Sequence, residues 1–274
     1  MSNVYEIVTN TIIEKLEQGT VPWRKPWTGG EAVSWKTQKP YRGINTMLLD
    51  PGEYITFKQV KDAGGKVKKG ASSSIVVFWK WIDKENDEGK IEKFPLLRYY
   101  RVFNIKDCEG IESKRPPAET FEHDPIQEAE NIIENYINKP DLQWRDLQAY
   151  YQPAGDFVNM PPMKSFYSIN EYYSTFFHEL VHSTGHKSRL AREGITGIAA
   201  FGSETYSKEE LVAEMGAAML CGVTGIDNST LDQSAAYVQS WLRALKDDKR
   251  LVVIAAAQAQ KAVDYIQNKK ADQN

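Results

Sequence analysis

The sequence predicts an α+β protein with a small N-terminal α+β half and a mainly helical C-terminal half. Runs rich in β-branched and aromatic residues occur at 54–57, 75–82 and 97–105, where glycine pairs and polar turns separate them. From residue 168 onward, apolar residues recur mainly at helical spacing. The length of 274 residues suits one large domain or two modest ones.

The elements follow in order along the chain. A helix over 4–18 is expected first, and Gly19 and Pro22 end it. Adjacent prolines and mixed charges make 116–124 a plausible linker between a domain at 1–115 and a domain at 125–274. In the second domain we expect helices over 125–137, 168–184, 207–221, 231–246 and 248–268, with short extended pieces at 149–152 and 156–160.

The two halves differ in charge. Residues 1–117 hold 20 basic and 15 acidic side chains, a net charge of +5, whereas the remainder carries −8. This asymmetry indicates separate tasks and makes the first half the better candidate for a polyanionic partner. Ordinary solvated surface charge explains the same counts equally well.

Several classes of protein are disfavoured. No stretch approaches the roughly 20 apolar residues that span a bilayer, and the first residues lack the layout of a secretory signal. Cys108 and Cys221 are too few for a disulfide framework and fit a reducing compartment. We therefore expect a cytoplasmic protein with no membrane partner.

The most informative motif is His178-Glu179-Leu180-Val181-His182. Ser168 and Glu171 have capping-box spacing and predict the start of its helix, and Gly185 suits the end. Histidines four residues apart share one helix face, so both imidazoles can reach one ion. Glu179 is placed to hold a water molecule and take its proton. The motif indicates a zinc site, and two histidines paired with polar neighbours are the structural alternative.

Catalytic zinc takes three protein ligands, so a third is needed. The later histidine of one zincin class would fall at Ser188, and His186 lies two residues too early. Ser207 and Glu210 have the spacing of a second capping box, so the helix dipole explains Glu210 as a first-turn acid. Glu214 lies mid-helix among small apolar residues, where a carboxylate needs compensation. We therefore prefer Glu214 to Glu210; such a site suits Zn²⁺ and accepts other divalent ions.

At this point a resemblance is clear: over nearly its whole length the sequence resembles the ArdC antirestriction proteins of conjugative plasmids and mobile elements. Separate matches follow one another in the same order along both halves. The matching segments are 19–27, 41–45, 56–59, 76–80, 178–186, 209–216 and 235–250.

The resemblance implies an N-terminal single-stranded-DNA-binding domain and a C-terminal zincin-like metallopeptidase domain. It implies His178, His182 and Glu214 as metal ligands, with Glu179 as catalytic base. The family role that it implies is protection of incoming mobile-element DNA from host restriction endonucleases. A restriction enzyme or another protein is the expected peptide partner.

Aromatic and basic residues of the first half suit a single strand, which is held by basic grooves and by aromatic faces on which bases stack. Five of the seven tryptophans precede residue 118. Two of them flank a cationic pair on a proline-stiffened segment, although a place in the core is the alternative for each tryptophan. The residues expected to contact DNA are Trp23, Arg24, Lys25, Trp27, Arg42, Lys58, Lys66, Lys68 and Lys69.

Two further functions compete with an active antirestriction peptidase. One is a non-catalytic protein that masks DNA or a protein and uses its metal only for structure. The other is a stand-alone metalloprotease that acts on a regulatory protein, with the basic half recognising an acidic partner. Substitution of Glu179 separates the first alternative from catalysis, and competition between DNA and the regulator tests the second.

Overall fold

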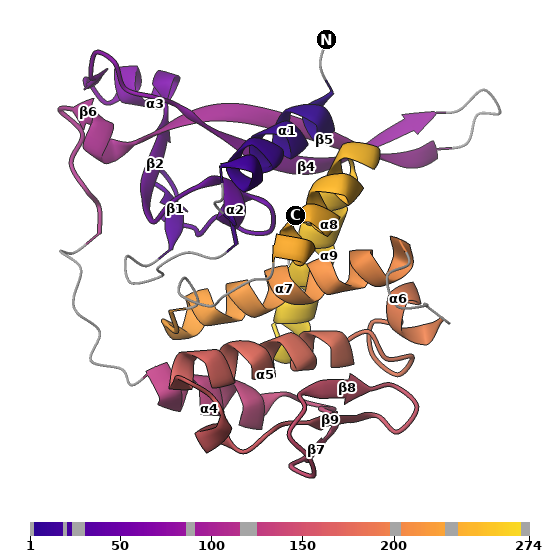
Figure 1. The fold of residues 1–274 in the computed structure, drawn as a ribbon. Helices are drawn as coiled ribbons and strands as arrows, with labels where there is room; N and C mark the ends of the chain where they lie inside the picture. Colours follow the sequence, from indigo (N-terminus) through magenta and orange to yellow (C-terminus); the bar gives the residue numbers. More distant parts are fainter. Residues whose placement is uncertain are drawn as a thin grey trace.

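The computed structural model describes residues 3–18, 21–23, 31–85, 91–115, 125–197, 204–227 and 235–269. In Figure 1 the strands of the N-terminal half lie at the top, and helices dominate the half below them. This arrangement confirms the α+β fold class. Within the described ranges, no helix combines the length and the apolar character needed to cross a membrane.

A four-stranded sheet organises the N-terminal half, with strand order β1-β2-β5-β4. β1 pairs with β2 in parallel, and the other pairs are antiparallel. Two short strands, β3 and β6, form a separate ribbon. The elements are α1 (Val4–Glu17), β1 (Ala32–Ser34), α2 (Asn45–Leu48), β2 (Gly52–Thr56), α3 (Phe57–Asp62), β3 (Lys66–Val67), β4 (Ser74–Glu85), β5 (Ile91–Asn104) and β6 (Cys108–Glu109).

The sheet contains the three predicted strands, with one change at the end of the first. Phe57 was expected to close a strand but begins α3 instead. The reason is a capping box: the Thr56 hydroxyl accepts from the Gln59 backbone N–H, and the Gln59 side chain accepts from the Thr56 N–H. These two bonds satisfy donors that a helix start leaves open, so the strand ends at Thr56.

The C-terminal half consists of helices and a small three-stranded sheet of order β7-β9-β8. α7 and α9 pack against each other and both contact α5, while β8 and β9 lie along α5. The elements are α4 (Pro125–Asn135), β7 (Asp141–Gln143), β8 (Tyr150–Gln152), β9 (Phe157–Asn159), α5 (Ile169–Ser183), α6 (Glu193–Thr196), α7 (Glu204–Thr224), α8 (Ala235–Asp247) and α9 (Leu251–Ile266).

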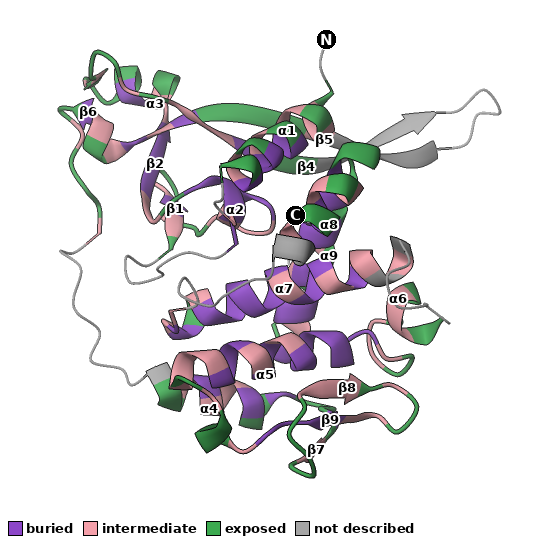
Figure 2. Ribbon diagram, in the orientation of Figure 1, coloured by how far each residue is buried: buried purple, intermediate pink, exposed green. Residues whose placement is uncertain are grey.

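The two halves share one hydrophobic core. α1 packs on α8 and α9, and the Thr9 hydroxyl donates to the Lys249 carbonyl at 2.5 Å. Trp23 is fully buried, with its ring 5.2 Å from that of Trp241 on α8. Figure 2 shows how far burial extends along α1, α5 and α7. The expected linker at 116–124 falls outside the described ranges, so the boundaries at 115 and 125 stay predictions.

α7 differs from expectation at its start. The sequence places a cap at Ser207, but the helix already begins at Glu204. Glu209 and Glu210 therefore lie in the second turn rather than the first, and the helix dipole does not account for them.

Candidate metal centre

α5 carries the predicted motif and starts after the predicted N-cap Ser168, but the capping box does not close, because the Glu171 carboxylate accepts from the Tyr167 backbone N–H. The Ser168 hydroxyl accepts a hydrogen bond from the Glu171 backbone N–H at 3.1 Å. Gly185 directly follows the C-cap Thr184, at the predicted C′ position, but its φ is not in the left-handed region that favours glycine there. A Cβ on Gly185 would lie 2.6 Å from Ile195 and 3.1 Å from Arg192. Gly185 is thus needed for close packing.

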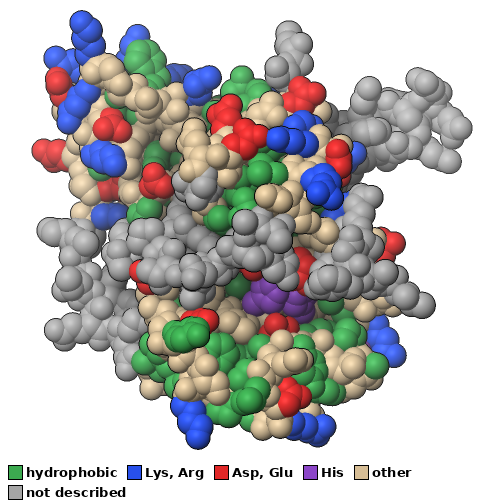
Figure 3. Space-filling view, viewed as in Figure 1, with side chains coloured by type: hydrophobic (Ala, Val, Ile, Leu, Met, Phe, Trp, Pro, Cys, Tyr) green, Lys and Arg blue, Asp and Glu red, His purple; other side chains and the backbone are tan. Residues whose placement is uncertain are grey.

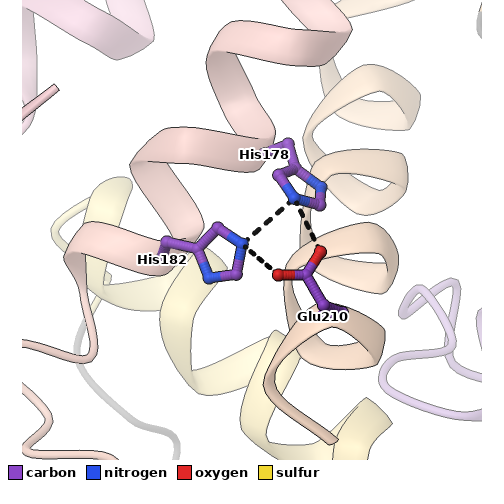
Figure 4. Close-up of side chains that lie close together, drawn as sticks. All are labelled: His178, His182 and Glu210. Carbon is purple, nitrogen blue, oxygen red and sulfur yellow. Dashed lines mark hydrogen bonds and ion pairs between the residues drawn. The ribbon is translucent and has the colours of Figure 1, made fainter. Parts of the chain in front are cut away.

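Three ligand atoms converge between α5 and α7 (Figure 4). The Nε2 atoms of His178 and His182 lie 3.0 Å apart. The two carboxylate oxygens of Glu210 each lie 3.5 Å from one of these nitrogens. All three side chains are largely buried, with between 10% and 19% of each exposed. Among the described residues, these three form the group able to hold a metal ion.

The separations fit a divalent cation. With ligand bonds of about 2.0–2.1 Å, tetrahedral zinc sets its ligand atoms about 3.3 Å apart. The two nitrogens lie 3.0 Å apart, and each lies 3.5 Å from a different oxygen of Glu210, so the nitrogens and the carboxylate are close enough to share one ion. Two imidazoles and one carboxylate are a ligand set that leaves a fourth position for water or substrate. The residues present therefore fit the group that the motif implies.

The geometry groups Glu210 with the two histidines, whereas the sequence favoured Glu214. A Glu214 oxygen lies 3.9 Å from Nδ1 of His178, on the side of the ring that faces away from the cluster. Glu214 lies one turn beyond Glu210 on α7, and it is Glu210 that this helix presents to both histidine Nε2 atoms. At this position Glu214 is suited to orient the His178 ring rather than to bind the ion.

Glu209, which sequence reasoning set aside, supports His182. Its carboxylate lies 3.3 Å from Nδ1 of His182, so Nε2 of that ring points to the cluster. Arg192 holds Glu209 through Nε at 2.9 Å and through its terminal nitrogen at 2.6 Å. Arg192 also donates to the Val181 carbonyl at 2.7 Å. A carboxylate behind a ligating histidine is a common device for fixing ring orientation and tautomer.

Gly216 lets α5 and α7 approach closely enough for this geometry. A Cβ at Gly216 would lie 2.8 Å from the Val181 side chain, closer than real Cβ atoms come to a neighbour. Alanines at 217 and 218 continue the small-residue surface and are buried. The expectation that small residues on this helix permit close packing is met at Gly216.

The cluster is electrostatically suited to a cation. Burial opposes a charge on the His178 imidazole, but the Glu210 carboxylate outweighs it, and the pKa of His178 rises to about 9. Glu179 and Glu214 add to this rise. Burial also raises the pKa of Glu209, but hydrogen bonds from Arg192 outweigh it and hold that pKa below its ordinary value.

Glu179 occupies the place that the motif predicts, next to His178 on α5, and it is buried. In Figure 3, histidine side chains reach the surface at the level of α5 and α7, with acidic side chains beside them. Glu179 stays a predicted catalytic base, close enough to influence the charge of His178.

The structure separates the residues predicted to contact DNA. Trp23 is fully buried against Trp241, so its ring offers no face to a base, and that expectation is wrong in this structure. Arg42 forms an ion pair with Asp264 of α9. Lys58, Lys66, Lys68 and Lys69 are exposed. Arg24, Lys25 and Trp27 lie outside the part of the chain that the structure describes.

The exposed lysines lie at the far end of the sheet from the metal centre, on α3 and around β3. Lys66 forms an ion pair with Glu109 at 3.2 Å, and the Lys68 ammonium donates to the Lys106 carbonyl at 2.8 Å. These contacts are exposed and cost little to exchange. The lysines form a basic end of the molecule but do not surround a single groove together with Arg42.

Sequence reasoning considered the acids Glu209 and Glu210 but set them aside, and it did not single out Arg192. The residues just before Ser207, Glu204, Thr205 and Tyr206, can all continue a helix upstream. A start at that point removes the first-turn explanation for the two acids. Arg192 follows α5 in a loop, and no periodic pattern marks it.

The fold and this cluster define a metallopeptidase-like domain of the zincin type, joined to an N-terminal α+β domain. Family comparisons agree. Residues 127–258 match the model of a zincin-like metallopeptidase. Residues 2–103 match the model of the N-terminal domain of the anti-restriction factor ArdC. The chain belongs to the ArdC antirestriction family.

Solved structures of one relative cover the whole chain. The antirestriction ArdC protein from the R388 plasmid is 38% identical, and its metal-free crystal structure superposes with a TM-score of 0.78. That match covers 98% of this chain and 100% of the relative. The Mn(II)-bound structure of the same relative has a TM-score of 0.77. That match covers 100% of both chains.

Sequence relatives differ in length. The Sinorhizobium fredii protein y4eC is 32% identical, with 99% of this chain and 94% of that protein aligned. Two Escherichia coli proteins described as DNA primase TraC are each 34% identical over 96% of this chain. The chain spans only 20% of one and 27% of the other.

Proposed function

We propose that this chain binds single-stranded DNA with its N-terminal half and protects incoming mobile-element DNA from restriction endonucleases. We propose further that His178, His182 and Glu210 hold a divalent cation, zinc being the first choice. The observation that carries the metal proposal is the convergence of two imidazole nitrogens and one carboxylate at separations of 3.0 and 3.5 Å. The Mn(II)-bound relative supports a divalent cation in this fold.

The chemistry that this centre supports is peptide hydrolysis. A cation held by the three side chains supplies Lewis-acid polarisation of a scissile carbonyl. Glu179 accepts the proton of the attacking water and returns it to the leaving amine. Glu209 and Glu214 hold the two imidazole rings by their outer nitrogens, so that the rings do not turn away during turnover.

The nucleic-acid part of the proposal is supported by charge and by the family. Residues 1–117 carry a net charge of +5, and exposed lysines gather on α3 and around β3. Basic surfaces attract phosphate backbones through the release of counterions. The match to the N-terminal domain of the anti-restriction factor ArdC supports this part of the proposal. We propose a cytoplasmic location, which suits two buried free cysteines.

One set of variants tests the proposal. Metal content of the purified chain is measured for the unmodified protein and for His178→Ala, together with protection of an unmodified plasmid entering a restricting host. We expect bound metal in the first and its loss in the second. Glu179→Gln should keep the metal and the fold.

The Glu179→Gln result separates catalysis from masking. Loss of protection in this variant with metal retained supports a peptidase that acts on a protein partner, such as a restriction enzyme. Full protection in Glu179→Gln supports the alternative in which the protein masks DNA or its target and the metal is structural. Absence of metal from the unmodified chain, after purification without chelators and incubation with Zn²⁺, contradicts the metal proposal.

A further inference from the structure

Exposed aromatic side chains gather on the paired part of β4 and β5. Phe78 and Tyr100 each expose 46% of their surface, whereas side chains of this size are mostly buried in folded proteins. The tryptophan favoured by the sequence, Trp23, is fully buried. If this half offers ring faces to a ligand, the sheet presents them rather than the segment around Trp23.

The strand register places these rings on one face. Tyr100 pairs with Val76, and Phe78 pairs with Arg98, so all four side chains share one side of the sheet. The rings of Phe78 and Tyr100 are 5.6 Å apart, and the half-buried Tyr41 ring lies 6.3 Å from Phe78. We call Tyr41, Phe78, Arg98 and Tyr100 the aromatic surface.

The aromatic surface leaves ring faces accessible. The planes of Phe78 and Tyr100 meet at 70°, and those of Tyr41 and Phe78 at 57°. The rings therefore touch edge to face instead of stacking on one another. Stacking faces remain available for planar ligands, as they do on other sheets that bind single strands.

Charge on these strands is of one sign. Residues 74–79 and 97–103 include two arginines, Arg98 and Arg101, and no aspartate or glutamate. Both arginines are exposed, but Arg101 pairs with Ile75 on the opposite face of the sheet, so Arg98 is the arginine of the aromatic surface. A guanidinium directly across the sheet from Phe78 is placed to meet a phosphate while a base stacks on the ring.

We propose that the aromatic surface is the place where a single-stranded nucleic acid stacks its bases, with Arg98 holding the backbone. This inference rests on the proposed DNA-binding function and deepens it. Phe78 and Tyr100 are the stacking positions, and Tyr41 supports Phe78 from the side. The exposed lysines on α3 and around β3 extend the basic path for the strand beyond the sheet.

A single strand fits this surface better than a protein partner. Protein interfaces with a buried centre combine aromatic residues with aliphatic anchors and satisfied polar groups. On the described part of this face, the exposed side chains are aromatic or cationic, and the aliphatic neighbours Val76 and Val102 are buried. Exposed rings beside an arginine match a polyanion with planar bases.

The test uses the full chain and a fluorescein-labelled oligothymidylate in an anisotropy titration at low salt. Phe78→Ala and Tyr100→Ala should each weaken binding by about 5- to 100-fold, the range measured for loss of one stacked base. Phe78→Trp keeps a stacking face and should bind within about threefold of the unmodified chain. Arg98→Gln should reduce the slope of log affinity against log salt by about one phosphate contact.

Tyr167→Ala is the matched control, because Tyr167 is fully exposed in the C-terminal half, away from the sheet. It should bind like the unmodified chain, and circular dichroism verifies that every variant is folded. If the unmodified chain binds no oligonucleotide, the proposed DNA-binding function fails. If it binds and the Phe78, Tyr100 and Arg98 variants all behave like Tyr167→Ala, the proposed location is overturned while the function stands.

Discussion

The metal centre and the aromatic surface lie in different halves of the chain and are assembled differently. The centre brings together two side chains one helical turn apart on α5 and one from α7. The aromatic surface consists of residues from two strands and a loop, between 41 and 100 in the chain. The side chains of the metal centre are largely buried and the rings of Phe78 and Tyr100 are exposed, and only the metal centre has a sequence spacing that indicates its geometry.

The difference shows in which secondary structure the spacing of residues predicts a site. In a helix, spacing fixes which side chains share a face, so His178 and His182 were found directly. In a sheet, alternation tells only that residues share a face; burial of that face depends on what packs above it. Trp23 and Phe78 are both aromatic residues of the basic half, yet one is fully buried and the other is 46% exposed.

The largest expected effect concerns the buried support of the metal centre. Arg192→Met would leave the buried Glu209 carboxylate without its cation and lower the free energy of unfolding by about 3–5 kcal/mol. Urea unfolding of the metal-free chain measures this change. The exposed Lys187→Met serves as control, with an expected change within about 0.5 kcal/mol. Equal stability of the two variants would show that the folded chain does not depend on the contact between Arg192 and Glu209.

A second prediction decides between the two acids of α7. Glu210→Ala should lower Zn²⁺ affinity by more than about 100-fold, beyond the range of an outer residue, and Glu214→Ala by about tenfold. Competition with a chromophoric chelator measures both affinities. The reverse order would restore Glu214, and with it the choice made from sequence. All three ligands of the metal centre would then have been predicted correctly from the sequence pattern.

A third prediction tests the approach of the two helices. Gly216→Ala places a methyl group against Val181 and should destabilise the chain by about 1–3 kcal/mol. Val181→Ala in the same chain makes room, so the double variant should recover part of the loss. A double-mutant cycle from thermal unfolding gives the coupling energy. Simple additivity of the two changes would mean that this contact does not set the separation of α5 and α7.

The smallest expected effect is the change in Zn²⁺ affinity for each pH unit. Because the folded-state pKa of His178 is raised to about 9, its protonated form stabilises the metal-free chain below pH 6.5. That contribution is lost as the pH rises towards 9. Metal binding needs the neutral ring, so Zn²⁺ affinity should rise about tenfold per pH unit between 7 and 9. Paired titrations at pH 7, 8 and 9 test this, and a flat profile contradicts it.

Much of the fold could be predicted from the sequence, for reasons visible in particular residues. β-branched and aromatic runs placed β4 and β5, and the Ser168 cap placed the start of α5. Boundaries failed where a competing cap was present, as at Thr56, or where a helix began before the residue that looked like its cap, as at Glu204. Both errors arise because several nearby residues can satisfy the open ends of a helix.

The sequence by itself determined the pair of histidines, the neighbouring Glu179 and the basic character of the first half, because local spacing and composition carry that information. Only the tertiary structure decided that Glu210 faces the histidines, that Arg192 and Glu209 support them, and that Trp23 is buried while Phe78 is exposed. These outcomes depend on contacts between segments far apart in the chain. Such contacts follow from packing, and no local period encodes them.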